Sequence, residues 1–132
     1  MQSSSASPAR TAALAAVADL VVVLGFAATG RATHNLDSPV LGVLATAWPF
    51  VVGLAAAWAA LRLWRRPLSA WPTGVVVWLG TYVIGMLLRW VSGGGMAVPF
   101  LLVALGTLGV FLVGWRAVVL GVRAGRRAAA DR

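Results

Sequence analysis

Four long apolar stretches, separated by short polar segments, dominate the pattern of this sequence. They cover residues 11–30, 40–61, 72–88 and 96–119. About 20 apolar residues, each rising 1.5 Å along a helix, are enough to cross the hydrocarbon core of a bilayer. The pattern therefore predicts an all-α integral membrane protein, built as a bundle of four transmembrane helices.

The segments outside these stretches predict two short flanking regions. Residues 1–10 are small and polar and are expected to form a disordered cytoplasmic tail, whereas residues 120–132 are expected to form a basic cytoplasmic extension of the last helix. Pro49 interrupts the second stretch, where a proline is expected to kink the helix. A cleaved signal peptide over residues 1–30 is an alternative for the first stretch, but Asp19 within it argues against that interpretation.

The composition is that of a chain whose solvent is lipid. Hydrophobic residues make up 61% of the chain and charged residues only 11%, whereas soluble domains carry about 25% charged residues. The chain has no cysteine, one histidine and three acidic residues, too few ligands for a typical metal site. One histidine is enough to hold a haem, but nothing else in the sequence indicates one. We therefore expect no metal, no cofactor and, since no nucleophile–base pair is recognisable, no enzymatic activity.

The distribution of the basic residues predicts an orientation in the membrane. All eleven are arginines, and they flank the apolar stretches instead of forming a separate basic domain, so nucleic acid is not an expected partner. Four helices place both tails and the middle loop on one side, which holds every arginine except Arg31 and Arg89. The positive-inside rule then predicts a multi-pass protein of the cell (plasma) membrane with both termini in the cytoplasm.

Asp19 is the sharpest chemical feature within the apolar stretches. A carboxylate inside a membrane helix costs about 2.5–3.5 kcal/mol on insertion scales, so Asp19 is expected to face the bundle. Arg62 and Arg116 end the second and fourth stretches on the same side, and either could pair with it. Two interpretations stay open: an ion pair that locks the bundle, and a site for a proton or another cation.

A second polar group is expected on the opposite side, formed by Arg31, His34, Asp37 and Arg89. His34 and Asp37 are three residues apart and would meet on a helical turn, and histidine titrates near neutral pH. The group could form a vestibule that binds an anion or relays protons. The alternative is a solvated loop beside an arginine whose stem lies in the apolar zone.

The arginines near the C-terminus predict contact with lipid headgroups. They fall within a sector of roughly 100° if the fourth helix continues, and anionic headgroups attract such residues by about 1 kcal/mol each. A docking surface for a soluble partner is the alternative. The residues are Arg116, Arg123, Arg126 and Arg127.

Small residues and deep tryptophans are interpreted first as packing features. The small residues allow helix backbones to approach closely, either within the chain or in a homo-oligomer. Trp58 and Trp78 lie deep in their helices, where core packing and an aromatic pocket for a lipophilic ligand are both open. The small residues are Gly53 with Ala57, Thr81 with Gly85, and Gly106, Gly114, Ala117, Gly121 and Gly125.

Several short motifs resemble a family of small bacterial membrane proteins known only as domain of unknown function 3054. The resemblance covers the chain from about Asp19 to Arg116 and implies a four-helix membrane protein, but it implies no activity and no functional residues. The motifs are Asp19, Gly30-Arg31 with His34, Trp48-Pro49-Phe50 with Gly53, and Gly85-Met86-Leu87-Leu88-Arg89 before the turn at residues 93–95.

Two functions remain as expectations. The first is a non-enzymatic accessory or scaffold protein, with anionic lipids and a homo-oligomer or another membrane protein as partners. The second is a small transporter or channel subunit for protons, ions or a small solute, using Asp19 and the outer group of Arg31, His34 and Arg89. The surroundings of Asp19 discriminate between them, because transport requires a path by which water or a solute reaches the carboxylate.

Overall fold

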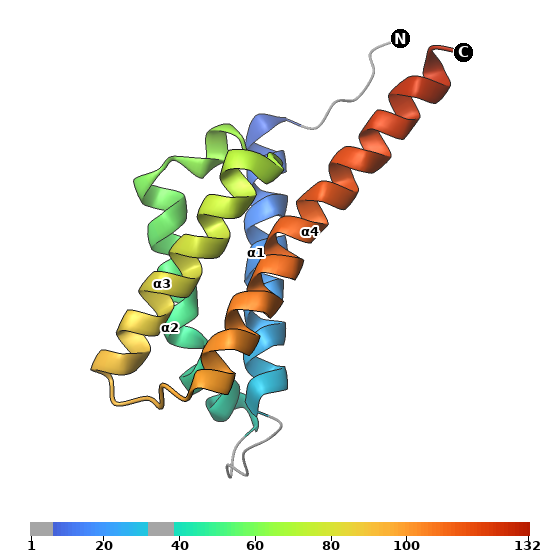
Figure 1. The fold of residues 1–132 in the computed structure, drawn as a ribbon. Coiled ribbons are helices and arrows are strands. Elements are labelled where there is room, and N and C mark those ends of the chain that lie inside the picture. The colour runs from blue at the N-terminus through green and yellow to red at the C-terminus, as the bar shows by residue number, and fades with distance from the viewer. Residues whose placement is uncertain (1–6, 32–38) are drawn as a thin grey trace.

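The computed structural model describes residues 7–31 and 39–132, and these residues form helices joined by short connections (Figure 1). The described part contains no strand. In chain order the elements are α1 (Pro8–Arg31), α2 (Pro39–Ala60), a 3₁₀ turn η1 (Leu63–Arg65), a π-helical turn η2 (Ala70–Gly74), α3 (Val75–Val91) and α4 (Val98–Ala130).

The four predicted membrane spans are all present. Each lies on a helix long and apolar enough to cross a membrane, as expected for a multi-pass membrane protein. Three of these helices have a proline in the first turn, where a backbone N–H has no partner within the helix. Pro8 and Pro39 open α1 and α2, and Pro99 lies in the first turn of α4. After α3, Gly93 turns the chain with a φ of +87°, which only glycine adopts without strain.

Several helix boundaries differ from the expected ones. Residues 8–10, expected in the tail, form the first turn of α1. Regular α3 begins three residues after its expected start, because residues up to Gly74 belong to the π-helical turn η2, in which Trp71 has extended dihedral angles (φ −131°, ψ 127°). Helix α2 runs through Pro49 as one element, and α4 continues without a break to Ala130.

The bundle is held most closely together between α2 and α3, where small residues let the two backbones touch. A Cβ on Gly53 would lie 3.0 Å from the carbonyl oxygen of Thr81, and one on Gly80 would lie 2.9 Å from the Cβ of Ala57. A side chain on Gly85 would collide with the ring of Phe50. The small residues expected on the second and third helices therefore serve packing within the chain.

Helix α4 is longer than a membrane requires. Its 33 residues give a length of about 50 Å at 1.5 Å per residue, against a hydrocarbon core of about 30 Å. Figure 1 shows the C-terminal part projecting past the other helices at the end of the molecule where α1 begins. Every residue from Leu120 onward is exposed, so this part is an arm with no packing partner among the described residues.

Candidate functional site

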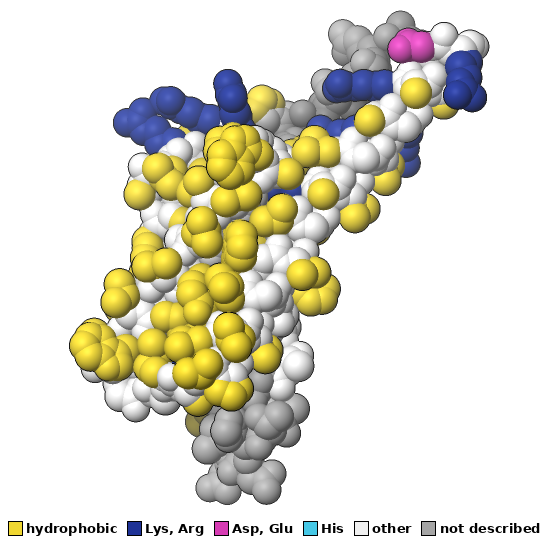
Figure 2. Space-filling view, viewed as in Figure 1, with side chains coloured by type: hydrophobic (Ala, Val, Ile, Leu, Met, Phe, Trp, Pro, Cys, Tyr) yellow, Lys and Arg dark blue, Asp and Glu magenta, His cyan; other side chains and the backbone are white. Residues whose placement is uncertain are grey.

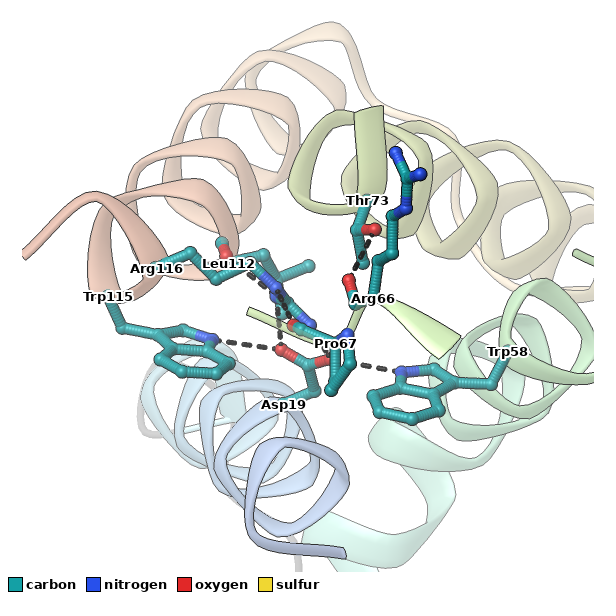
Figure 3. Close-up of polar contacts among 8 residues, drawn as sticks. All are labelled: Asp19, Trp58, Arg66, Pro67, Thr73, Leu112, Trp115 and Arg116. Carbon is teal, nitrogen blue, oxygen red and sulfur yellow. Dashed lines mark hydrogen bonds and ion pairs between the residues drawn. The ribbon is translucent and has the colours of Figure 1, made fainter. Parts of the chain in front are cut away.

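Asp19 lies in the middle of α1 and is completely buried, with 0% of its surface exposed. Its carboxylate forms a two-pronged ion pair with Arg116 of α4, which is equally buried (Figure 3). Arg116 Nη1 donates to Oδ1 and Nη2 donates to Oδ2, each over 2.7 Å. This parallel arrangement is the strongest geometry available to an arginine and a carboxylate.

Two tryptophans complete the coordination of the carboxylate. Trp115 donates its indole N–H to Oδ1 over 2.9 Å, and Trp58 of α2 donates its own to Oδ2 over 3.0 Å. Each carboxylate oxygen therefore accepts two hydrogen bonds, one from the arginine and one from an indole. Donors from α2 and α4 thus converge on a single acceptor of α1.

Arg116 is held from its other side by backbone carbonyls. Nε donates to the carbonyl of Pro67 over 2.8 Å, and Nη1 also donates to the carbonyl of Leu112 one turn earlier, over 2.9 Å. The guanidinium lies 4.5 Å from the ring centre of Trp115, close enough for a cation–π contact. A Cβ on Gly74 would lie 3.2 Å from Arg116 Cδ. The glycine at the start of the third span therefore leaves the space that the Arg116 side chain occupies.

The buried position of Pro67 explains how the connection between α2 and α3 reaches the site. This proline follows η1 and is itself buried. One residue earlier, the carbonyl of Arg66 accepts a hydrogen bond of 2.7 Å from the hydroxyl of Thr73, which ties the connection to η2. The connection therefore folds back over the ion pair and covers it at the end of the bundle where α1 begins.

The Asp19 cluster consists of Asp19, Trp58, Pro67, Trp115 and Arg116. Its chemistry is limited because all acceptor positions of the carboxylate are already occupied. The carboxylate has four donors on two oxygens, so no position is left for a cation. Among the described residues no three histidine, cysteine or acidic side chains gather as a metal site would require. The two charges neutralise each other in a region closed to solvent, an arrangement that resists separation because either ion alone would be buried without a partner.

The structure separates the two arginines that the sequence left as alternatives for Asp19. Arg116 is the partner, whereas Arg62 is exposed in a left-handed backbone conformation (φ 50°) and takes no part in the cluster. Because Arg116 is buried, it also cannot reach headgroups together with Arg123, Arg126 and Arg127. Those three are exposed on the projecting arm of α4.

The outer polar group is described only at Arg89. His34 and Asp37 and the side chain of Arg31 lie outside the described residues, so the vestibule stays a prediction. Arg89 Nε donates to the carbonyl of Gly95 over 2.8 Å, and its guanidinium lies 4.2 Å from the ring centre of Phe100. It thereby ties the turn after α3 to the start of α4.

Trp58 and Trp78 both have structural partners. Trp58 belongs to the cluster, and Trp78 donates to the carbonyl of Leu105 over 2.8 Å while its ring packs on Gly109. Sequence reasoning did not connect Trp58, Trp115 or Pro67 with Asp19. A signal was present, since a buried indole N–H needs an acceptor and Asp19 is the only carboxylate inside the four apolar stretches.

Comparison with known protein families shows which family the chain belongs to. The sequence profile of one family matches residues 16–119, from the middle of α1 to the part of α4 just past Arg116. The chain belongs to this family, described as a protein of unknown function (DUF3054). The DUF3054 region contains the whole Asp19 cluster and leaves the arm with Arg123, Arg126 and Arg127 outside it. No curated protein and no solved structure matches the chain significantly.

Proposed function

We propose that this DUF3054 protein is a non-enzymatic accessory or scaffold protein of the cell membrane, and that the Asp19–Arg116 pair fixes its helices in one arrangement. The observation that carries the proposal is the saturation of Asp19, whose four acceptor positions are filled by side chains of the same chain. A carboxylate held in this way favours a rigid bundle over an exchanging site.

Transport is less well supported because it needs a carboxylate that changes partners. A solute or proton reaching Asp19 would have to displace Arg116 or an indole, and breaking a buried pair costs about 3–5 kcal/mol. One surface pocket lies near the α2–α3 connection and another between α3 and α4, and neither of these is lined by Asp19 or Arg116. Both charged side chains have 0% exposure.

The proposed orientation places both termini in the cytoplasm. The start of α1, the α2–α3 connection and the arm of α4 lie at the same end of the bundle (Figure 1), and this end carries most of the arginines (Figure 2). Because the chain has no cysteine, single cysteines report sidedness cleanly. In intact cells an impermeant maleimide should label Gly95→Cys, at an exposed position with room for a side chain, and leave Ala128→Cys unlabelled. The reverse pattern would refute the orientation.

The projecting arm of α4 supports a role in which other molecules are held at the membrane. Arg123, Arg126 and Arg127 are exposed on it, which suits anionic headgroups or an acidic surface of a partner.

A Cβ on Gly106 or Gly114 would meet nothing within 4 Å. A side chain at either position would therefore extend into open space among the described residues, as a homo-oligomer or another membrane protein packing there would require.

The test is a flux measurement on liposomes that contain the purified protein. Proton, sodium and potassium gradients are imposed on wild type, on Asp19→Asn and on Asp131→Asn, which makes the same change at an exposed carboxylate. We expect no flux above that of empty liposomes for any of the three proteins. Flux through wild type that is retained by Asp131→Asn and abolished by Asp19→Asn, with helix content unchanged by circular dichroism, would refute the proposal and make Asp19 the centre of a transporter.

A further inference from the structure

A surface pocket of about 380 Å³ lies beside the α2–α3 connection, and neither Asp19 nor Arg116 lines it. Its wall is apolar and its rim carries three arginines. The lining residues are Leu61, Leu63, Pro72, Thr73 and Val76, with Arg62, Arg65 and Arg66 at the rim. On the face shown in Figure 2, dark blue side chains gather over this connection and hydrophobic ones continue below it.

The three arginines are held close together by the backbone that carries them. Two turn hydrogen bonds of 3.1 Å join the N–H groups of Arg65 and Arg66 to the carbonyls of Arg62 and Leu63. The hydroxyl of Thr73 fixes the carbonyl of Arg66 at 2.7 Å, and Figure 3 shows the Arg66 side chain pointing away from Asp19. All three guanidinium groups are exposed, with no acidic partner among the described residues.

The height of the pocket along the bundle matches the membrane–water interface. The second span ends at Ala60, directly before the pocket, and the third begins at Ala70. Trp64 and Trp71 flank the pocket with exposed fractions of 48% and 74%. Exposed tryptophans at the ends of membrane spans are typical of the headgroup level. A ligand in this pocket would therefore have its polar part at the headgroups and its apolar part among the acyl chains.

We propose that this pocket binds one anionic phospholipid. The phosphate lies among Arg62, Arg65 and Arg66, and the start of an acyl chain follows the apolar wall formed by Leu61 and Val76. Guanidinium groups bind phosphate oxygens through paired N–H donors, and the apolar wall discriminates a lipid from a soluble phosphate. The site is distinct from Arg123, Arg126 and Arg127 of the α4 arm, none of which lines the pocket.

The experiment is native mass spectrometry of the full chain released from detergent micelles, titrated with phosphatidylglycerol or with phosphatidylcholine. Wild type should retain one phosphatidylglycerol at concentrations at which phosphatidylcholine is lost. The double variant Arg65→Gln/Arg66→Gln should lower the affinity for that lipid about tenfold or more. The matched control Arg10→Gln/Arg132→Gln removes the same charge from exposed positions that are neither in the pocket nor among the three arginines of the arm, and should keep the affinity within about twofold.

Three outcomes would overturn the proposal. Equal losses in the pocket variant and in the Arg10→Gln/Arg132→Gln control would mean that net charge, and not the pocket, attracts the lipid. Equal retention of the two lipids by wild type would remove the anionic specificity. Complete displacement of phosphatidylglycerol by millimolar inorganic phosphate would identify a soluble phosphate as the ligand. Because the substituted arginines are exposed, unchanged circular dichroism is expected, and retained lipid is counted only on folded protein.

Discussion

Replacing Asp19 by asparagine tests whether the buried charge, and not only its hydrogen bonds, stabilises the bundle. The substitution keeps the shape of the side chain and turns one acceptor oxygen into a donor NH₂. Whichever way the amide is oriented, one N–H of Arg116 and one indole N–H then face a donor. The guanidinium, which has 0% exposure, also loses the carboxylate with which it forms an ion pair.

The lost hydrogen bonds and the unpaired charge contribute different amounts to the loss of unfolding free energy. Side-chain hydrogen bonds between membrane helices average about 0.6 kcal/mol each in double-mutant cycles, so the loss of two predicts about 1.2 kcal/mol. Leaving a buried charge without its partner costs about 3–5 kcal/mol. We expect the larger figure, a sizeable part of the 5–15 kcal/mol by which folded proteins are typically stable.

The assay is reversible unfolding in mixed micelles, with increasing dodecyl sulfate and helix content followed by circular dichroism. Asp131→Asn is the control, because an exposed carboxylate at the chain end should change the unfolding free energy by less than about 0.5 kcal/mol. The double variant Asp19→Asn/Arg116→Gln removes both charges. It should recover more than half of the loss, since a neutral replacement of a buried pair is often tolerated.

A loss near 1 kcal/mol for Asp19→Asn would contradict the reasoning, as would a double variant less stable than the single one. Either result would mean that Arg116 reaches water or lipid phosphate once released. The cluster would then be a set of ordinary hydrogen bonds, and the rigidity assumed for the bundle would need another source.

Two further predictions concern the α2–α3 interface and use the same unfolding assay. Gly85→Ala should destabilise the bundle by about 1–2 kcal/mol, because the new methyl group must displace an aromatic ring. The control Gly106→Ala, in open space, should stabilise it by up to about 1 kcal/mol. Equal effects of the two substitutions would refute the close packing. Thr81→Val should stabilise by about 1 kcal/mol, because it removes a buried hydroxyl that has no hydrogen-bond partner. Thr73→Val, which breaks a bond of 2.7 Å, should shift stability by a similar amount in the opposite direction, and a shared sign would contradict this account.

Hydropathy and length were enough to predict the number of helices and the inward direction of Asp19. Both follow from local rules, since an apolar stretch must be long enough to cross the lipid and a charge must avoid it. The sequence could not choose between Arg62 and Arg116. That choice depends on the left-handed turn at Arg62 and on the return of Pro67 to the bundle, which are features of a connection and not of any periodic pattern.

The same limit applies to the small residues. Helical spacing predicted that Gly53 and Thr81 lie on contact faces, but spacing alone does not say which helix packs against which face. Only the assembled bundle shows that these two residues meet each other. Trp115 was missed for a similar reason, because its contact with Asp19 spans 96 residues of sequence.

The separation of the two charges along the chain has a consequence for biosynthesis. Arg116 is made 97 residues after Asp19, which at 5–20 residues per second is a delay of roughly 5–20 s. During this delay the first helix contains a carboxylate whose partner has not yet left the ribosome. Three of the four donors to Asp19 come from Trp115 and Arg116, so a chain cut short before these residues would retain an unpaired carboxylate inside its first helix.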